Sequence, residues 1–191
     1  SPSSKNLGLE NTKITLNSKG YIETNDQLQT EEPSIYACGD VVGPYQFAHM
    51  ASYQARLIIK NIVGKTKSSI DYTSIPWVTF TSPEVAHVGK TEQDAISEGI
   101  FKKSIITKFD RVDRSHVDNK KEGFLKLNLN HNNEIIGAAI VGKNAGEHLP
   151  LITAAIKEKR TPDYFLDILI AYPTKSEILT LAAKDFLAQE S

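Results

Sequence analysis

The stretch "GFLKLNLNHNNEIIGAAIVG", residues 123–142, contains two apolar segments separated by a polar turn. Residues 123–130 and residues 134–142 each have the length and composition of a β-strand. Between them, His131, Asn132 and Asn133 form a group of turn-favouring residues. We therefore predict two antiparallel strands joined by this turn.

Further elements lie on both sides of this pair. Upstream, "KSIITKFD" (103–110) predicts a third strand of a meander, and "WVTF" (77–80) and "VAHVG" (85–89) predict two short strands. Thr91 is placed to cap a helix over residues 92–99. Downstream, residues 146–159 and 176–188 have helical apolar spacing, and Thr161 and Pro162 open a short helix between them. Strands followed by helices, with hairpin-length connections, predict an α+β fold in which helices flank an antiparallel sheet.

The N-terminal third has a different pattern. Residues 13–25 alternate around a turn at Gly20, which predicts a hairpin, and residues 34–38 predict a buried strand. Residues 46–64 have the spacing of an amphipathic helix that ends at Gly64. The polar, turn-rich segment that follows indicates a boundary. We expect one domain over residues 1–65, a linker over 66–74 and a second domain over 75–191.

Asp40 follows the predicted strand 34–38 directly after Gly39. In open α/β sheets ligands bind at the carboxyl ends of strands, where an acid can accept hydrogen bonds from ligand hydroxyls. The alternative is a turn aspartate that satisfies its own backbone.

The composition excludes several classes of function. The 191 residues are 40% hydrophobic and 24% charged with a net charge of -1, so nucleic acid is not an expected partner. Cys38 is the only cysteine and the five histidines are scattered, so we expect no disulfide framework and no metal site. No apolar run approaches the roughly 18 residues that span a bilayer, and no leader opens the chain. We expect a soluble, cytoplasmic protein with no membrane segment.

Motifs for complete catalysis are absent. The sequence contains no G-x-G-x-x-G turn, no G-x-x-x-x-G-K phosphate loop and no G-x-S-x-G elbow. Taken alone, the chain does not read as a complete enzyme.

Five blocks together resemble one family. These are residues 7–55, "PWVTFTSPEVAHVGKTE" (76–92), "VDRSHVDNKKEGFLKL" (112–127), "IIGAAIVGKNAGE" (135–147) and "AYPTKSEILTLAA" (171–183). In this order they resemble the C-terminal part of the FAD-dependent pyridine nucleotide-disulfide oxidoreductases, in particular lipoamide dehydrogenases and mercuric-reductase-like proteins. The resemblance implies that residues 1–65 are the last piece of an α/β FAD-binding domain and that residues 75–191 are a dimerisation domain, so we expect a homodimer. It also implies a longer parent protein, with the glycine-rich turn, a cysteine pair and an NAD(P)H domain upstream.

The resemblance assigns flavin contacts to the first domain. The Gly39-Asp40 pair corresponds to the family motif whose aspartate binds a ribityl hydroxyl of FAD. Backbone amides near Ala48 and His49, at a helix start, are candidates for the pyrimidine ring of the flavin, where reduced flavin carries negative charge. The His49 side chain has the alternative of being an ordinary helix residue. Without the glycine-rich turn, we expect this chain alone to bind FAD weakly or not at all.

The motif "AYPTKSE" (171–177) supplies the second site. In disulfide reductases of this family the corresponding motif has histidine before Pro-Thr, paired with a glutamate five positions later, and it reaches the cysteine pair of the other subunit. Here Tyr172 occupies the histidine position and Glu177 is retained. Tyrosine titrates near 10, so it cannot be the thiol base at neutral pH, but it can donate a hydrogen bond to a thiolate or lie beside a soft metal. Glu177 also fits a capping box with Thr174.

The resemblance implies that the parent passes electrons from NAD(P)H through FAD and a cysteine pair to an unidentified acceptor, a small molecule or a metal ion. Tyr172 argues against lipoamide dehydrogenase, whereas a mercuric reductase would carry tyrosine here but end in a cysteine pair that "FLAQES" lacks. The alternative is a structural dimerisation module without catalysis.

Overall fold

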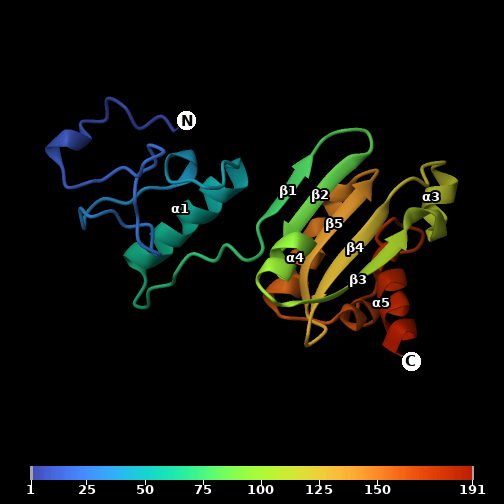
Figure 1. The fold of residues 1–191 in the computed structure, drawn as a ribbon. Coiled ribbons are helices and arrows are strands. Elements are labelled where there is room, and N and C mark those ends of the chain that lie inside the picture. Colours follow the sequence, from blue (N-terminus) through green and yellow to red (C-terminus); the bar gives the residue numbers. More distant parts are fainter. Residues whose placement is uncertain (1, 191) are drawn as a thin grey trace. The chain divides into compact units, whose positions relative to one another are not determined.

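The structure, a computed structural model, describes residues 2–190 and divides the chain into two compact units (Figure 1). The first unit extends to Tyr72 and the second begins at Thr73. This division falls inside the segment predicted as a linker.

The second unit is built on a five-stranded antiparallel sheet in the order β1-β2-β5-β4-β3. The strands are β1 (Pro76–Thr79), β2 (Glu84–Gly89), β3 (Phe101–Lys108), β4 (Phe124–Asn130) and β5 (Ile135–Gly142). All five predicted strands are confirmed, and β3, β4 and β5 form the predicted meander. The antiparallel α+β fold class is therefore confirmed.

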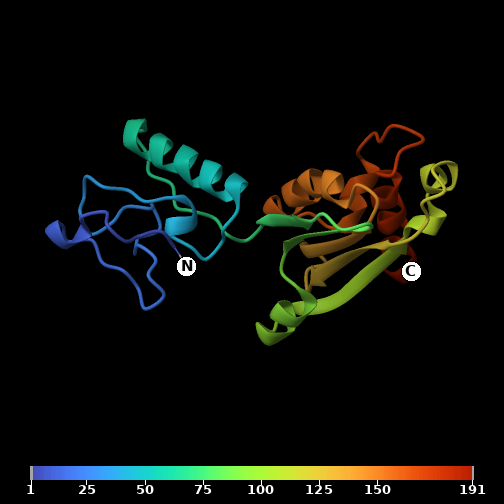
Figure 2. The ribbon, with the colours of Figure 1, turned by 90° about the horizontal axis from the view of Figure 1, so that it is seen from above.

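The two longer helices cover one side of the sheet. The longer helices, α4 (Leu149–Lys157) and α5 (Glu177–Glu190), pack against β2, β5, β3 and β4, and Figure 2 shows them on the side of the sheet opposite α2 (Glu92–Ser97). The shorter helical segments are η3 (Phe109–Arg111), α3 (Asp113–Val117), η4 (Ala145–His148) and η5 (Pro162–Leu166). Thr91 caps α2 as predicted, because its hydroxyl accepts the Asp94 amide. The short helix α3 was not predicted.

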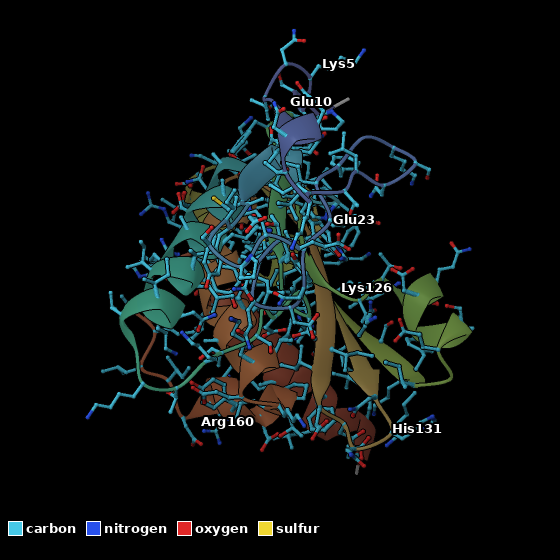
Figure 3. All side chains as sticks on the ribbon, turned by 90° about the vertical axis from the view of Figure 1, so that its left-hand side faces the viewer. Lys5, Glu10, Glu23, Lys126, His131 and Arg160 are labelled. Atoms are coloured by element: carbon cyan, nitrogen blue, oxygen red, sulfur yellow. The ribbon has the colours of Figure 1, made fainter. Side chains whose placement is uncertain are left out.

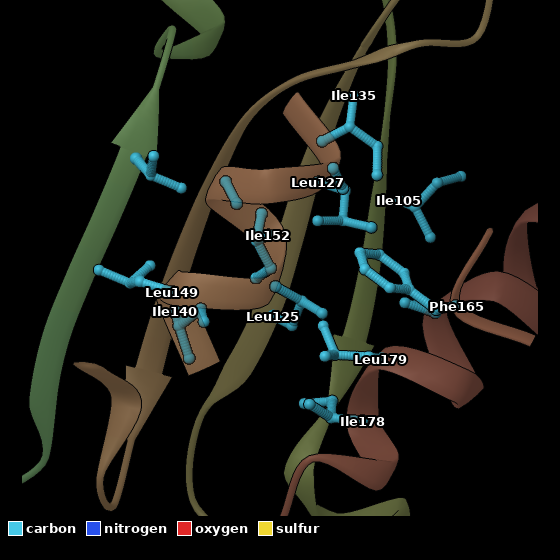
Figure 4. Close-up of a cluster of buried hydrophobic side chains, with 14 of the residues drawn as sticks. Ile105, Leu125, Leu127, Ile135, Ile140, Leu149, Ile152, Phe165, Ile178 and Leu179 are labelled. Carbon is cyan, nitrogen blue, oxygen red and sulfur yellow. The ribbon is translucent and has the colours of Figure 1, made fainter. Parts of the chain in front are cut away.

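The core of this unit lies between the sheet and α4 and α5 (Figure 4). Leu125, Leu127 and Leu129 alternate along β4 and are completely buried, which matches the spacing of two residues per face in a strand. Ile152 from α4 and Leu179 from α5 close over them. The alternating pattern of "FLKLNLN" therefore selects the face that the helices cover.

The opposite face of the sheet carries a second apolar set, here called the open face. Because paired residues of neighbouring strands share a face, the register places these side chains together. Its members are half-buried or exposed: Trp77, Val85, Ile106, Phe124, Ala139 and Val141. Charged side chains surround the sheet, and Figure 3 shows His131 at the turn between β4 and β5.

Gly123 is required at the start of β4. It has φ of 108°, a left-handed conformation that side chains rarely adopt, and a Cβ here would lie 1.8 Å from the Val141 carbonyl oxygen. The strands therefore approach too closely at this point for any other residue.

The first unit is organised around α1 (Ala48–Val63). Its buried face carries Met50, Gln54, Leu57 and Ile58 at helical spacing, and Gly64 ends the helix, so this prediction is confirmed. Two short helical turns, η1 (Leu9–Asn11) and η2 (Gly39–Val41), complete its regular structure. Of residues 2–190, no helix is long and apolar enough to cross a membrane.

The predicted strand over residues 34–38 is wrong. In the described residues this segment makes one isolated bridge, between Gln29 and Tyr36, and Ile35 is 37% exposed. Two backbone hydrogen bonds, Thr30 amide to Ile35 carbonyl and Ala37 amide to Leu28 carbonyl, join the segment to residues 28–30, and this ladder is too short to make a strand. The predicted hairpin over residues 13–25 keeps its turn at Asn17 and Gly20 but is likewise reduced to one bridge, between Leu16 and Ile22.

We predict that Leu127→Ala lowers the free energy of unfolding of the second unit by about 2–5 kcal/mol, because the deletion leaves a cavity in a site that the sheet and helices cannot collapse. Ile96→Ala on α2, where the side chain is 56% exposed, is the control and should cost much less. Urea unfolding followed by the fluorescence of Trp77, the single tryptophan, measures both variants. Equal losses in the two variants would contradict the assignment of the core.

Candidate functional site

The Gly39-Asp40 turn is held against α1. The Gly39 amide donates a 2.6 Å hydrogen bond to Oε1 of Gln54, which is 1% exposed. Gly39 has φ of 79°, and a Cβ here would lie 3.2 Å from the Ala51 Cβ. Glycine is therefore needed both for the backbone conformation and for the contact with the helix.

Asp40 is exposed, and within residues 2–190 its carboxylate makes no hydrogen bond. The alternative interpretation, a turn aspartate that satisfies its own backbone, has no hydrogen bond to support it. The carboxylate is open to a hydroxyl donor from outside the unit.

The start of α1 lies next to this turn, because η2 packs against α1. Ala48 and His49 are exposed, and the N-cap residue Phe47 provides no side-chain cap. The Phe47 and His49 rings stack with their centroids 5.1 Å apart. The first unit thus brings together the four residues predicted to contact a flavin: Gly39, Asp40, Ala48 and His49.

Tyr172 lies in the second unit on an exposed loop before α5. Its side chain is 72% exposed, and its hydroxyl donates a 2.7 Å hydrogen bond to Oδ2 of Asp113, the first residue of α3. This hydrogen bond to Asp113, followed by the charge of that carboxylate, raises the pKa of Tyr172 above its usual value of 10, and Glu177 acts in the same direction. The phenol is therefore protonated at neutral pH, and its one proton lies in the hydrogen bond to Asp113, so its oxygen can act toward a further group only as an acceptor.

Glu177 begins α5 but does not form the predicted capping box. The Thr174 hydroxyl donates to the Ala171 carbonyl at 2.7 Å, and the Glu177 amide donates to the Thr174 carbonyl at 3.3 Å. Oε2 of Glu177 is buried and has no hydrogen-bond partner in the described part of the chain. The structure thus gives Tyr172 a closer carboxylate partner, Asp113, than the one predicted.

Two buried polar residues flank the same loop. Lys175 is 9% exposed, and its ammonium donates to the Ser115 hydroxyl at 3.3 Å and to the Lys120 carbonyl at 3.0 Å. His148 is 5% exposed, and its Nδ1 lies 3.3 Å from the Ser176 hydroxyl. Burial, then the nearby charge of Lys175, lowers the pKa of His148 to about 4, so the ring is neutral at pH 7.

Sequence reasoning missed Asp113, Lys175 and His148 as site residues. Asp113 is 59 positions from Tyr172 and belongs to a five-residue helix that was not predicted. His148 and Lys175 occupy positions where the apolar spacing of the flanking helices carries no information about a polar partner. For His148 and Lys175 the one available signal was that they lie at or near a predicted helix start, and Asp113 had no such signal.

We predict that His148 makes the stability of this unit depend on pH. Its pKa is near 4 when folded and 6.5 when unfolded, so the unfolded state binds more protons between these values, and stability falls as the pH drops from 6.5 to 4. The shift corresponds to about 3 kcal/mol at most. His148→Met should remove this part of the pH dependence, measured by urea unfolding at pH 7 and pH 4, whereas His131→Gln at the exposed turn should keep it. An unchanged difference between the two pH values in His148→Met would refute the assignment.

Comparison with known proteins agrees with these two units. Residues 75–183 match the family described as "Pyridine nucleotide-disulphide oxidoreductase, dimerisation domain", and residues 1–55 match the family described as "Pyridine nucleotide-disulphide oxidoreductase".

Among similar proteins, mercuric reductase from Staphylococcus aureus is 37% identical over 186 residues, which cover 97% of this chain and 34% of that protein. Dihydrolipoyl dehydrogenase from Geobacillus stearothermophilus is 37% identical over 184 residues, which cover 96% of this chain and 39% of that protein. Among solved structures, LpdA from Mycobacterium tuberculosis has a TM-score of 0.89 at 26% identity, covering 97% of this chain and 40% of that one. The flavoprotein disulfide reductase RclA from Escherichia coli has a TM-score of 0.85 at 25% identity, covering 94% of this chain and 42% of that one.

This chain therefore spans between 34% and 39% of the length of these two curated relatives. The family match covers most of the second unit and includes the sheet, α4 and the start of α5. The chain belongs to the pyridine nucleotide-disulphide oxidoreductase family and carries its dimerisation domain.

Proposed function

We propose that this chain is the C-terminal part of a flavoprotein reductase that passes electrons from NAD(P)H through FAD and a cysteine pair to an acceptor. Residues 1–65 would complete the flavin site, residues 66–74 would link the domains, and residues 75–191 would form the homodimer interface. The main support for the proposal is the position of Tyr172: it lies on an exposed loop of the dimerisation domain, and its hydroxyl donates a hydrogen bond to Asp113. We also propose that the protein works in the cytoplasm, where its single cysteine, Cys38, would stay reduced.

The first unit fits a flavin in two respects. The Asp40 carboxylate is exposed and has no hydrogen bond inside the described chain, as a group that binds a ribityl hydroxyl requires. The first turn of α1 places the amides of Ala48 and His49 at the positive end of a 16-residue helix, where negative charge is stabilised. FAD, when bound, would supply the transfer of electrons from nicotinamide to disulfide. Because the sequence lacks a glycine-rich pyrophosphate turn, we expect the rest of the parent to be needed for tight binding.

The open face supports the homodimer. Its six apolar side chains share the face of the sheet that α4 and α5 leave uncovered, with His87 and Lys126 between them and Glu92 of α2 bonded to Lys126, and Ile106 is 56% exposed. Exposed apolar patches of this kind mark interfaces, and a two-fold dimer buries the same patch on both subunits. Each Tyr172 loop would then face the cysteine pair of the other subunit.

The chemistry of Tyr172 limits what the acceptor site can do. The phenol stays protonated at neutral pH, so it does not take a proton from a thiol. Its oxygen lone pairs can accept a hydrogen bond from a thiol or lie against a metal ion. We therefore propose a small-molecule or metal-ion acceptor whose reduction needs no base at this position. In the described residues, no three His, Cys, Asp or Glu side chains gather to hold a resident metal.

We predict that the chain is a dimer at micromolar concentration and that Ile106→Lys shifts it toward monomer, because a charge would be buried in the interface. Ile62→Lys on α1 of the first unit is a matched control, since Ile62 is 54% exposed and Ile106 is 56% exposed, and Ile62 does not belong to the sheet. Light scattering with a sizing column measures the mass. A wild-type chain that is only monomeric, or a control that dissociates equally, would rule out the open face as the interface.

For the full-length protein we predict a selective effect of Tyr172 on the second half-reaction. Tyr172→Phe should slow reduction of the acceptor about two- to twelvefold, through loss of one hydrogen-bonding group worth about 0.5–1.5 kcal/mol, and should spare reduction of the flavin. Tyr172→His would supply a group that titrates near neutrality, so reduction of small disulfides should rise, since base catalysis typically contributes about a hundredfold or more. Stopped-flow measurement separates the two half-reactions.

The alternative hypothesis, a purely structural dimerisation module, predicts a different result. In that case Tyr172 only packs before Pro173, and both variants lose stability without a selective effect on the acceptor. Equal slowing of both half-reactions in both variants would therefore remove the proposed role of Tyr172.

A further inference from the structure

A pocket of about 300 Å³ lies beside the loop that follows Tyr172. Pro173 and Thr174 form one part of its wall, and Lys143 and Asn144 after β5 form another. A water molecule occupies about 30 Å³ in the liquid, so the pocket has room for a small ion together with several waters.

Lys175 gives this pocket a buried positive charge. The side chain is 9% exposed, and its ammonium bonds to two neutral oxygens, those of Ser115 and Lys120. In the described part of the chain no carboxylate forms an ion pair with it. A buried charge without a counter-ion is costly. An ammonium has three protons to donate, of which Ser115 and Lys120 accept two, and the Phe109 ring centroid lies 5.6 Å from Nζ.

His148 adds a second buried polar group to the wall. It is 5% exposed, and its Nε2 has no hydrogen-bond partner among residues 2–190. When the Ser176 hydroxyl donates to Nδ1, the ring carries its proton on Nε2. That N–H is then a buried donor without an acceptor.

The other charges of the pocket leave a positive excess. The Asp118 carboxylate forms ion pairs with two cations, Nε of Arg114 at 2.8 Å and Nζ of Lys143 at 3.4 Å, so its single negative charge balances only one of them. With Lys175 and Glu147 included, three basic and two acidic side chains line the pocket. Burial lowers the pKa of Lys175, the charge of Asp118 acts against this, and the charges of Lys143 and Arg114 add to the lowering.

We propose that this pocket binds a small oxyanion of the phosphate class, with Lys175 as its principal partner and Lys143 as a second cation. An oxyanion supplies the negative charge that Lys175 lacks and acceptor oxygens for the unpaired donors. The proposal involves no flavin and no electron transfer, so it goes beyond the reductase function and does not depend on it.

Inorganic phosphate is the probe. For the wild-type chain at pH 7, we expect phosphate to raise the thermal unfolding temperature in a saturable way relative to sodium chloride at the same ionic strength, because a ligand that binds only the folded state stabilises it. Lys175→Met should abolish the increase and should unfold at a higher temperature than wild type without phosphate, since an uncompensated buried charge is removed. Lys184→Met on the exposed part of α5 removes the same charge and should keep the full response.

Lys143→Met provides a second variant in case Lys175→Met does not fold, since the Lys143 side chain is 49% exposed. It should weaken phosphate binding about tenfold or more, the usual effect of losing a hydrogen bond to a charged group, when measured by isothermal titration. General salting-out by phosphate would act equally on every variant. An equal response in wild type, Lys143→Met and Lys184→Met, or no difference between phosphate and chloride in wild type, would overturn the proposal.

Discussion

The leucine row of β4 is the constraint on which the rest of the second unit depends. Leu125, Leu127 and Leu129 are fully buried, and β4 lies between β3 and β5 while α4 and α5 cover its apolar face. Packing α5 onto this row determines where the helix begins, and therefore where the preceding loop leaves the core. Ile178 and Leu179 in the first turn of α5 are buried, whereas Tyr172 in the preceding loop is 72% exposed.

Two polar side chains beside this loop, Lys175 and His148, are buried and therefore largely removed from water. Lys175 is buried with neutral oxygen partners and lies over the Phe109 ring, with 5.6 Å between its Nζ and the ring centroid. His148 is buried with one nitrogen unpaired, which keeps its ring neutral at physiological pH. Natural folds retain such groups against their desolvation cost, and they cluster at sites that bind or react. Here they gather within a few residues of the proposed acceptor loop.

At position 172 a tyrosine stands where the family motif has histidine, and this removes base catalysis from the position rather than weakening it. A histidine can exchange a proton near pH 7, whereas Tyr172 is held in its protonated form by the carboxylate of Asp113. Asp113 rather than Glu177 is the direct partner: the Tyr172 hydroxyl donates to Oδ2 of Asp113, whereas Oε2 of Glu177 is buried and has no hydrogen-bond partner in the described residues. A loop of this kind can position or ligate an acceptor, but it cannot act as a base for a thiol.

The sequence by itself determined the second unit almost completely. The alternation in "FLKLNLN", the turn at His131 and the helical spacing in "SEILTLAAKDFLA" are local patterns, and local patterns fix strands and helices when burial agrees with them. The predicted strand over residues 34–38 is wrong because a strand also needs an extended ladder with its neighbour, and periodicity does not report how long that ladder is. The partner of Tyr172, the burial of Lys175 and the unpaired nitrogen of His148 were decided by tertiary structure alone. Each depends on residues from different elements that come together only in the folded protein. Asp113 and Tyr172 are 59 positions apart, and no local sequence pattern indicates that they form a hydrogen bond.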